Sequence, residues 1–156
     1  MDDLYRMPGH LIRRAQQIST ALFTAECAEF DVTSVQYAAL RMIAAHPGVD
    51  ATRLSALIAF DRSTIGDVLE RLEAKGWIRR GPGAEDRRIK VLTLTDAGAV
   101  LLDRVAPAVR RVQERLLAPL APEDRVTMIR LLGELAELHN EATAAPLRPA
   151  AGKATV

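Results

Sequence analysis

The basic side chains gathered in residues 79–90 are the strongest candidate for chemistry in this sequence. The stretch RRGPGAEDRRIK holds five basic and two acidic side chains, a net charge of +3, while the rest of the 156-residue chain sums to −2. Such a local basic patch is typical of a surface that meets a polyanion. Two β-prone runs, 77–80 and 89–94, flank a Gly-Pro-Gly segment, so we predict that the charge lies on a β-hairpin.

A second group of polar side chains lies at the start of a predicted helix. In the stretch DRSTIGDVLERLEAKG, Asp61 has the properties of an N-cap, apolar residues recur on one face, and Gly76 is expected to end the helix. Polar and arginine side chains at the start of a helix suit the base edges in the major groove of DNA, which is about 12 Å wide. In this sequence they are Arg62, Ser63, Thr64, Asp67 and Arg71.

The predicted helix and hairpin fit one partner, double-stranded DNA. Arginine is the side chain that best enters a narrow, electronegative minor groove, and Arg87 and Arg88 lie at the predicted hairpin tip. Asp86 beside them is placed to orient an arginine rather than to meet the DNA. The predicted DNA-binding residues are Arg62, Ser63, Thr64, Asp67, Arg71, Asp86, Arg87, Arg88 and Lys90.

The elements that must position these residues are mostly helical. Leu11, Ala15, Ile18 and Leu22 recur at spacings of four, three and four, which places them on the inward face of a helix over 7–29. The same periodicity predicts further helices after Thr33 or Ser34, over 51–59, after Thr95 and after Pro122. The predicted fold class is therefore mostly α with a small β-hairpin wing: a winged helix-turn-helix between N- and C-terminal helices.

Length and composition restrict the class of protein. A chain of 156 residues is one domain in size, and nearly half of its residues are apolar, as in a mostly helical globular protein. No apolar run approaches the roughly 18 residues that a membrane span needs. The N-terminus starts acidic and lacks the apolar core of a signal peptide. We expect no membrane partner and a cytoplasmic location.

Candidate nucleophiles and metal ligands are too few to predict an enzyme. The histidines are His10, His46 and His139, no HExxH motif is present, and no glycine-rich phosphate loop follows a strand. We therefore predict neither catalysis nor a metal or cofactor site.

Cys27 is the only cysteine, so the chain has no internal disulfide. A thiol-based redox sensor is one alternative function. Such a thiol needs a lowered pKa and access to solvent. Glu26 and Glu29 flank Cys27 and should raise its pKa instead, which favours a small buried residue.

Together these stretches resemble the MarR family of bacterial transcriptional regulators. The resemblance rests on VTSVQYAALRMI, RSTIGDVLERLEAKGWIRR and EDRRIKVLTLTDAG, and the flanking helices fit up to about Ala144. The family's wing signature is met by Asp86, Arg88, Leu94, Thr95 and Gly98. It implies that Arg88 enters the minor groove while Asp86 holds it in place. Many relatives carry a polar and then a basic residue where this chain has Gly66 and Asp67, so the operator sequence does not follow.

The resemblance also implies a homodimer with interlocked terminal helices and a palindromic operator. Two recognition helices would then lie roughly 34 Å apart, in successive major grooves. The terminal helices carry more apolar residues than one small winged domain can cover, which agrees with this assembly. The predicted divisions are an N-terminal dimerisation helix (1–31), the winged helix-turn-helix (32–96), C-terminal dimerisation helices (97–144) and a disordered tail (145–156).

Most regulators of this kind are repressors that a small molecule, often an aromatic acid, releases from DNA. In this chain His10, Arg14 and Gln17 form a polar stripe at i, i+4 and i+7, and such cationic groups can hold a carboxylate. The opening PGHLIRR loosely resembles regulators of nicotinate and other aromatic-acid breakdown, so the predicted effector is a hydroxylated nicotinate or benzoate. Its predicted contacts are Met7, His10, Arg14, Gln17, Phe23, Tyr37 and Arg41.

Two alternative interpretations, without an effector site and without DNA binding, stay open at this point. The polar stripe on the first helix can be an ordinary solvated face, with Tyr37 in the core. The winged helix can also serve protein–protein contacts without DNA or a ligand. Salt dependence separates these functions, because binding dominated by phosphate contacts weakens steeply as salt rises.

Overall fold

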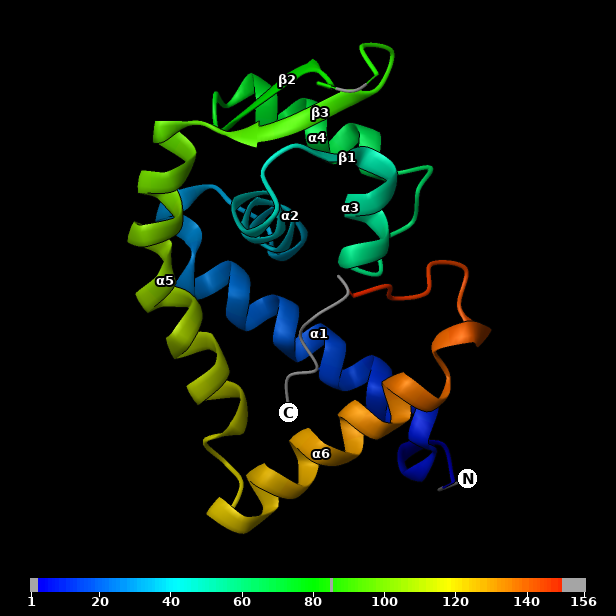
Figure 1. Cartoon of the computed structure of the whole chain (residues 1–156). Helices are drawn as coiled ribbons and strands as arrows, with labels where there is room; N and C mark the ends of the chain where they lie inside the picture. Colours follow the sequence, from blue (N-terminus) through cyan, green and yellow to red (C-terminus); the bar gives the residue numbers. More distant parts are fainter. Residues whose placement is uncertain (1–2, 85, 150–156) are drawn as a thin grey trace.

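Three long helices, Pro8–Glu26, Asp96–Leu117 and Pro122–Leu138, form a frame that carries a small winged domain, residues 34–94, at one end (Figure 1). The structure is a computed structural model that describes residues 3–84 and 86–149. Its elements are η1 (Leu4–Arg6), α1 (Pro8–Glu26), η2 (Ala28–Phe30), α2 (Ser34–Ala45), β1 (Val49–Asp50), α3 (Ala51–Leu57), α4 (Ile65–Ala74), β2 (Ile78–Pro82), β3 (Lys90–Leu94), α5 (Asp96–Leu117), α6 (Pro122–Leu138) and η3 (Asn140–Ala142).

The mostly helical fold class with a small wing is confirmed. The described strands form one antiparallel sheet in the order β1-β3-β2. The hairpin of β2 and β3 was predicted. The structure adds its register, in which Arg80 lies opposite Leu92 and Pro82 opposite Lys90. β1 was not predicted, because two residues carry no periodic signal; it pairs Val49 with Leu92 on the other edge of β3.

Side-chain caps explain where two of the helices begin. The Thr33 hydroxyl accepts from the Gln36 backbone N–H, and the Gln36 side chain accepts from the Thr33 N–H, a complete capping box at α2. Thr95 caps α5 by accepting from the Gly98 N–H at 3.1 Å. Thr95 was the predicted cap of its helix, and Thr33 was one of two candidates with Ser34.

The start of α4 differs from the prediction. Asp61 is not its N-cap: the helix begins at Ile65, and Arg62, Ser63 and Thr64 form the turn ahead of it. Asp61 still organises this turn, since its carboxylate accepts from the Ser63 N–H at 2.6 Å. An aspartate that caps a helix and one that closes a short turn use the same acceptor, so the sequence signal is the same.

The winged domain has its own apolar core. Side chains from each of its helices and from β2 and β3 meet in the middle of the domain. The largest that are fully buried there are Leu40, Ile43, Leu54, Leu69, Leu72, Ile78 and Leu92. This core fixes α4 and the wing relative to each other.

A second apolar cluster joins α1, α5 and the segment before α2. It consists of Phe23, Cys27, Val32, Val105, Ala108 and Val112. Phe30, Tyr37 and Trp77 pack against both this cluster and the core of the winged domain. Helices α1 and α5 are therefore in continuous apolar contact with the winged domain.

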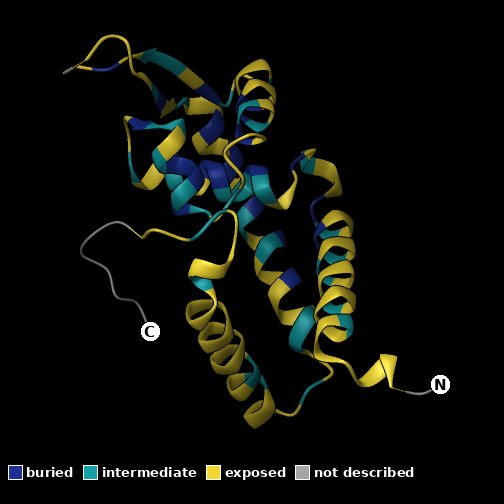
Figure 2. Cartoon of the chain, turned by 90° about the vertical axis from the view of Figure 1, so that its right-hand side faces the viewer, coloured by how far each residue is buried: buried dark blue, intermediate teal, exposed yellow. Residues whose placement is uncertain are grey.

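The rest of the frame is exposed in the single chain (Figure 2). The predicted inward face of α1 is wrong for one chain, because Leu11 is 51% and Ile18 47% exposed and only Phe23 of this helix is buried. α6, whose residues are all described, buries none of them. Within the described part of the chain, every helix is too short or too polar to span a bilayer.

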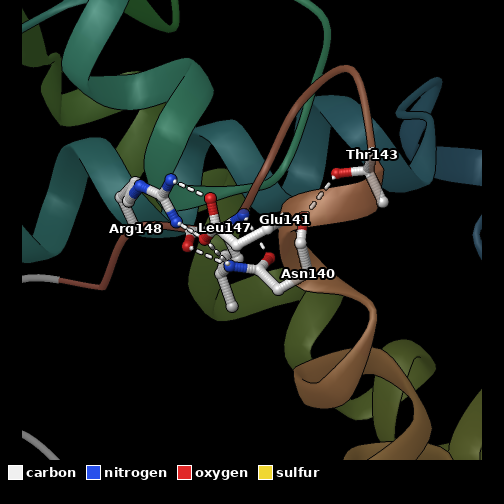
Figure 3. A network of polar contacts seen from close by, with 5 residues as sticks. All are labelled: Asn140, Glu141, Thr143, Leu147 and Arg148. Carbon is white, nitrogen blue, oxygen red and sulfur yellow. Dashed lines mark hydrogen bonds and ion pairs between the residues drawn. The ribbon is translucent and has the colours of Figure 1, made fainter.

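Residues after η3 turn back to the winged domain. The Asn140 side chain accepts from the Leu147 N–H and donates to its carbonyl, and Arg148 pairs with Glu141 (Figure 3). The Arg148 N–H then donates to the Ala56 carbonyl of α3 at 2.7 Å. The tail from 145 was predicted to be disordered, and this stays a prediction. In the structure these bonds involve Leu147 and Arg148 of the tail, and 150–156 lies outside the described residues.

Candidate nucleic-acid interface and neighbouring pocket

The predicted DNA-binding side chains are all exposed. They come from the turn before α4, from the first two turns of α4 and from the wing. Arg62, Ser63, Thr64, Asp67, Arg71, Asp86, Arg87, Arg88 and Lys90 all lie at the surface. None of them is used to build the core, so all of them are accessible from solvent.

The turn before α4 is held by its own hydroxyl groups. Besides the backbone bond, the Ser63 hydroxyl donates to the Asp61 carboxylate, and the Thr64 hydroxyl donates to the Asp61 carbonyl at 3.2 Å. The Ser63 hydroxyl and backbone N–H hold the pKa of Asp61 below its ordinary value. Both hydroxyl hydrogens are thus engaged within the turn, which leaves Arg62 as its donor to an outside group.

The wing presents Arg88 from a fixed backbone. The Asp86 carboxylate accepts from the Arg88 N–H at 2.9 Å and lies 3.9 Å from the guanidinium Nε, while the Arg88 side chain is 95% exposed. Gly83 is required at the tip, since a Cβ there would lie 2.7 Å from the Asp86 carbonyl. Asp86 therefore shapes the wing and leaves the Arg88 side chain extended.

The wing is anchored at its base to the rest of the domain. Arg80 Nε of β2 lies 3.0 Å from Glu73 Oε2 of α4. The Thr95 N–H donates to the Trp77 carbonyl, and a Cβ on Gly98 would lie 2.2 Å from that same oxygen. The wing signature residues Thr95 and Gly98 thus bring the start of α5 against the end of α4.

A polar-lined pocket lies between α1, α2 and α5. It has a volume of about 220 Å³. Two of the predicted effector contacts meet there, Phe23 and Tyr37, with ring centroids 6.3 Å apart. Its lining is Gln16, Ser19, Thr20, Phe23, Ser34, Tyr37, Val109, Val112 and Gln113. A neighbouring pocket of about 270 Å³ shares Thr20, Phe23 and Ser34 with it and continues along the segment Cys27–Ser34.

The other predicted effector contacts are not brought to this pocket. Arg14 and Phe23 are nine residues apart on α1, and at 100° per residue their side chains leave opposite faces of the helix. The His10 ring instead packs edge-on against Tyr5 at 5.6 Å. Met7, Gln17 and Arg41 are exposed and lie outside the lining.

Sequence reasoning missed the polar lining of the pocket. Gln16, Thr20 and Phe23 recur at spacings of four and three, so they share the α1 face that turns toward α5. Small polar residues beside a buried aromatic were the available signal. Val112 and Gln113 could not be added, because only the folded chain brings α5 against α1.

Cys27 is buried beside an ion-paired carboxylate. Burial raises the pKa of its thiol, with a smaller contribution from Glu26, so the predicted direction is confirmed. Glu26 is bound by Arg111 at 2.8 Å and by Arg115 at 2.6 Å, and these guanidinium groups lower its own pKa. Within residues 3–84 and 86–149, no three histidine, cysteine or acidic side chains gather as metal ligands.

Comparisons with known proteins agree with this geometry. The MarR family model matches residues 30–89. The HTH-type transcriptional repressor NicR of Pseudomonas putida is 32% identical over 133 residues, which cover 85% of this chain and 84% of NicR.

Two solved structures match nearly the whole fold. One is the transcriptional repressor CouR bound to a 23-mer DNA duplex, with a TM-score of 0.81 and 28% identity over 87% of this chain and 96% of CouR. The other is Bordetella bronchiseptica BpsR, whose DNA binding is regulated by 6-hydroxynicotinic acid. It has a TM-score of 0.80 and 27% identity over 84% of this chain and 94% of BpsR.

Proposed function

Because this chain belongs to the MarR family of transcriptional regulators, we propose that it is a homodimeric repressor released from DNA by a small aromatic carboxylate. It is a regulator and not an enzyme. The observation that carries the proposal is the wing, where Arg88 extends into solvent from a backbone that Asp86 fixes. The DNA-bound relative CouR and the ligand-regulated relative BpsR support the two halves of the proposal.

The DNA contact is tested at Arg88. Arg88→Ala should weaken binding to a promoter fragment by about 1–3 kcal/mol, measured by fluorescence anisotropy, because it removes a guanidinium from the groove. Arg110→Ala, an exposed residue of α5, removes the same charge away from the wing and is the control. Equal affinities for both variants, or wild-type binding that ignores salt, would favour the protein-contact alternative.

The exposed apolar side chains of the frame support the dimer. α6 carries several of them at 42% exposure or more: Val126, Ile129, Leu131, Leu132, Leu135 and Leu138. Leu131, Leu132, Leu135 and Leu138 recur at helical spacings and therefore share one face of α6. An exposed apolar face of this kind marks a protein interface. Sedimentation equilibrium should give twice the chain mass of 17.0 kDa.

The effector is assigned to the pocket of Phe23 and Tyr37. Their rings offer apolar faces to an aromatic ring of the ligand. Ser34 is the first residue of α2, where free backbone N–H groups and the helix dipole favour an anion. We therefore place the ligand ring against Phe23 and Tyr37 and its carboxylate at Ser34. The roles predicted for Met7, His10, Arg14, Gln17 and Arg41 stay predictions.

A thermal-shift assay tests this assignment. 6-Hydroxynicotinic acid should raise the melting temperature and its neutral carboxamide should not, because a ligand that prefers the folded state stabilises it. Val109→Phe fills the pocket and should abolish the shift. Val100→Phe, at an exposed position of the same helix, is the matched control and should keep it. A shift that survives Val109→Phe would place the ligand elsewhere.

A further inference from the structure

Lys75 links the end of the recognition helix to the turn before α2. It is the C-cap residue of α4, directly after the last helical residue, Ala74. Its Nζ lies 2.9 Å from Asp31 Oδ2 and also donates to the Asp31 carbonyl. The same ammonium stands 4.7 Å above the Trp77 ring. One cation thus contacts the helix that faces DNA, the root of the wing and the turn between α1 and α2.

Asp31 lies outside the lining of the Phe23 and Tyr37 pocket but lines the neighbouring pocket, which shares Ser34 with it. It lines the 270 Å³ cavity together with Thr33 and Ser34, three residues along the chain. Its φ of 49° lies in the left-handed region, which an aspartate adopts only at a tight turn. Lys75 binds both the carboxylate and the carbonyl of this residue, so it holds the turn in that conformation.

Trp77 carries the contact onward to the wing. Its ring packs against the cluster that contains Phe23 and Val32 as well as against the core of the winged domain. Its carbonyl accepts from the Thr95 N–H at 3.0 Å, where β3 ends and α5 begins. A shift at Lys75 therefore reaches α4 and both ends of the wing hairpin through packed atoms.

We propose that Lys75 is the positioning residue that couples effector binding to the recognition helix. The proposal rests on the proposed function, in which an aromatic carboxylate occupies the pocket at Ser34. A bound anion there adds negative charge three residues from Asp31 and rearranges the turn 31–34. Lys75 follows the carboxylate and the carbonyl of Asp31, and α4 moves with its C-cap residue.

The exposure of the pair explains why its role is coupling rather than stability. The side chain of Lys75 is 27% exposed and that of Asp31 is 90% exposed. An ion pair so open to water adds little to the free energy of unfolding. Coupling requires only that the contact differ between the effector-bound and the DNA-bound state.

The experiment measures the operator Kd without effector and at saturating 6-hydroxynicotinic acid; the ratio is the coupling. For wild type we expect a ratio of about 5 to 150, the usual range for coupled sites. Lys75→Met keeps a long unbranched side chain but removes the ammonium, and it should bring the ratio close to 1. Asp31→Asn should give an intermediate ratio, because the Asp31 carbonyl remains. Lys75→Arg should retain most of the wild-type ratio.

The variants control for net charge. Lys75→Met lowers the charge of the chain by one and Asp31→Asn raises it by one, so a loss of coupling in both cannot come from general attraction to DNA. Arg110→Met removes one surface charge from α5 and should leave the ratio unchanged. The melting temperature without effector verifies that each variant is folded.

Trp77 gives a second readout, since it is the only tryptophan of the chain. The described lining of both pockets leaves it out, so a bound ligand does not touch it directly. Saturating effector should change Trp77 emission in wild type and in Lys75→Arg, and this change should be lost in Lys75→Met. Free N-acetyltryptophanamide at the same ligand concentration corrects for absorption by the effector.

The outcomes separate the two proposals. If the ratio of operator Kd values with and without effector is the same in Lys75→Met as in wild type, the coupling role is overturned and the proposed function stays intact. Absence of any effector response in wild type, by melting temperature and by operator release, overturns the proposed effector and the coupling role together. A Kd ratio that falls further in Lys75→Met than in Asp31→Asn supports both the proposed effector and the coupling role.

Discussion

The winged domain and α6 are built from similar residues but bury them differently. In the winged domain, leucines from α2, α3 and α4 are fully buried, including Leu40, Leu54 and Leu72. In α6, Leu132 is 48% and Leu138 is 82% exposed. The winged domain completes a core by itself, whereas α6 leaves its apolar side chains exposed in the single chain.

This difference separates two tasks. A closed core holds α4 and the wing in a fixed relation, which is what a DNA-reading unit requires. An open apolar helix leaves the spacing between two such units to the assembly. In the proposed dimer, the effector pocket lies between α1 and α5 of the frame and α2 of the winged domain, so a bound ligand contacts both parts of the chain.

The largest expected effect comes from charging the apolar surface of α6. Leu131→Asp combined with Leu135→Asp should reduce the mass in solution from that of a dimer to 17.0 kDa. Each uncompensated buried charge costs about 3–5 kcal/mol. Sedimentation velocity measures the mass. Arg130→Gln with Glu134→Gln, an ion pair on the same helix, is the control and should keep the dimer. A wild-type protein that is monomeric at all concentrations would contradict the comparison itself.

A somewhat smaller effect is expected inside the winged domain. Leu40→Ala removes a fully buried side chain and should lower the free energy of unfolding by about 2–5 kcal/mol in urea titration at fixed protein concentration. Val100→Ala, at a residue 56% exposed on α5, should change it by less than about 0.5 kcal/mol. Similar losses for the two would mean that the core is not where the structure places it.

Two glycines of the winged region give the next contrast. Gly98→Ala puts a Cβ 2.2 Å from the Trp77 carbonyl and should cost about 1–3 kcal/mol, or more if the backbone cannot shift. Gly66→Ala inside α4 meets open space and should stabilise the protein by about 0.4–1 kcal/mol. Thermal unfolding measures both, and a Gly98→Ala protein as stable as wild type would show that α5 does not pack against the wing root this closely.

The smallest effect is the pH dependence of the Glu26 ion pairs between α1 and α5. Arg111 and Arg115 lower the folded-state pKa of Glu26 below 4.5. Their stabilising effect is therefore complete above that pH and is lost as pH falls through the lower folded value. Glu26→Gln should melt earlier than wild type near neutral pH, and the two melting curves should converge in acid. A difference that persists at low pH would point to packing instead.

Local features of the sequence predicted much of the DNA-facing region. The charge of the wing, the capping residues Thr33 and Thr95 and the apolar periodicity of α2 and α4 depend on neighbours within a few residues. Asp61 shows the limit of such signals, because a cap and a turn share one hydrogen-bond acceptor. The domain boundaries at 31, 96 and 144 stay predictions.

The pocket was predicted less well, for a geometric reason. Phe23 and Tyr37 were identified as aromatic residues, and the structure brings them together. Arg14 was predicted as a further contact because it is a cationic member of a polar stripe, yet helix geometry turns it to the face of α1 opposite Phe23. A polar stripe on a helix does not reveal which side meets the neighbouring helices.

What the sequence by itself determined is the main helices, the wing hairpin and the charge they carry, since helix periodicity, caps and turn residues act over a few positions. The tertiary structure decided the contacts between distant residues. Lys75 binds Asp31 across 44 positions, Arg111 binds Glu26 across 85, and Arg53 of α3 binds the Pro149 carbonyl across 96. Such pairs leave no local pattern, because they exist only after the apolar clusters have brought the helices together.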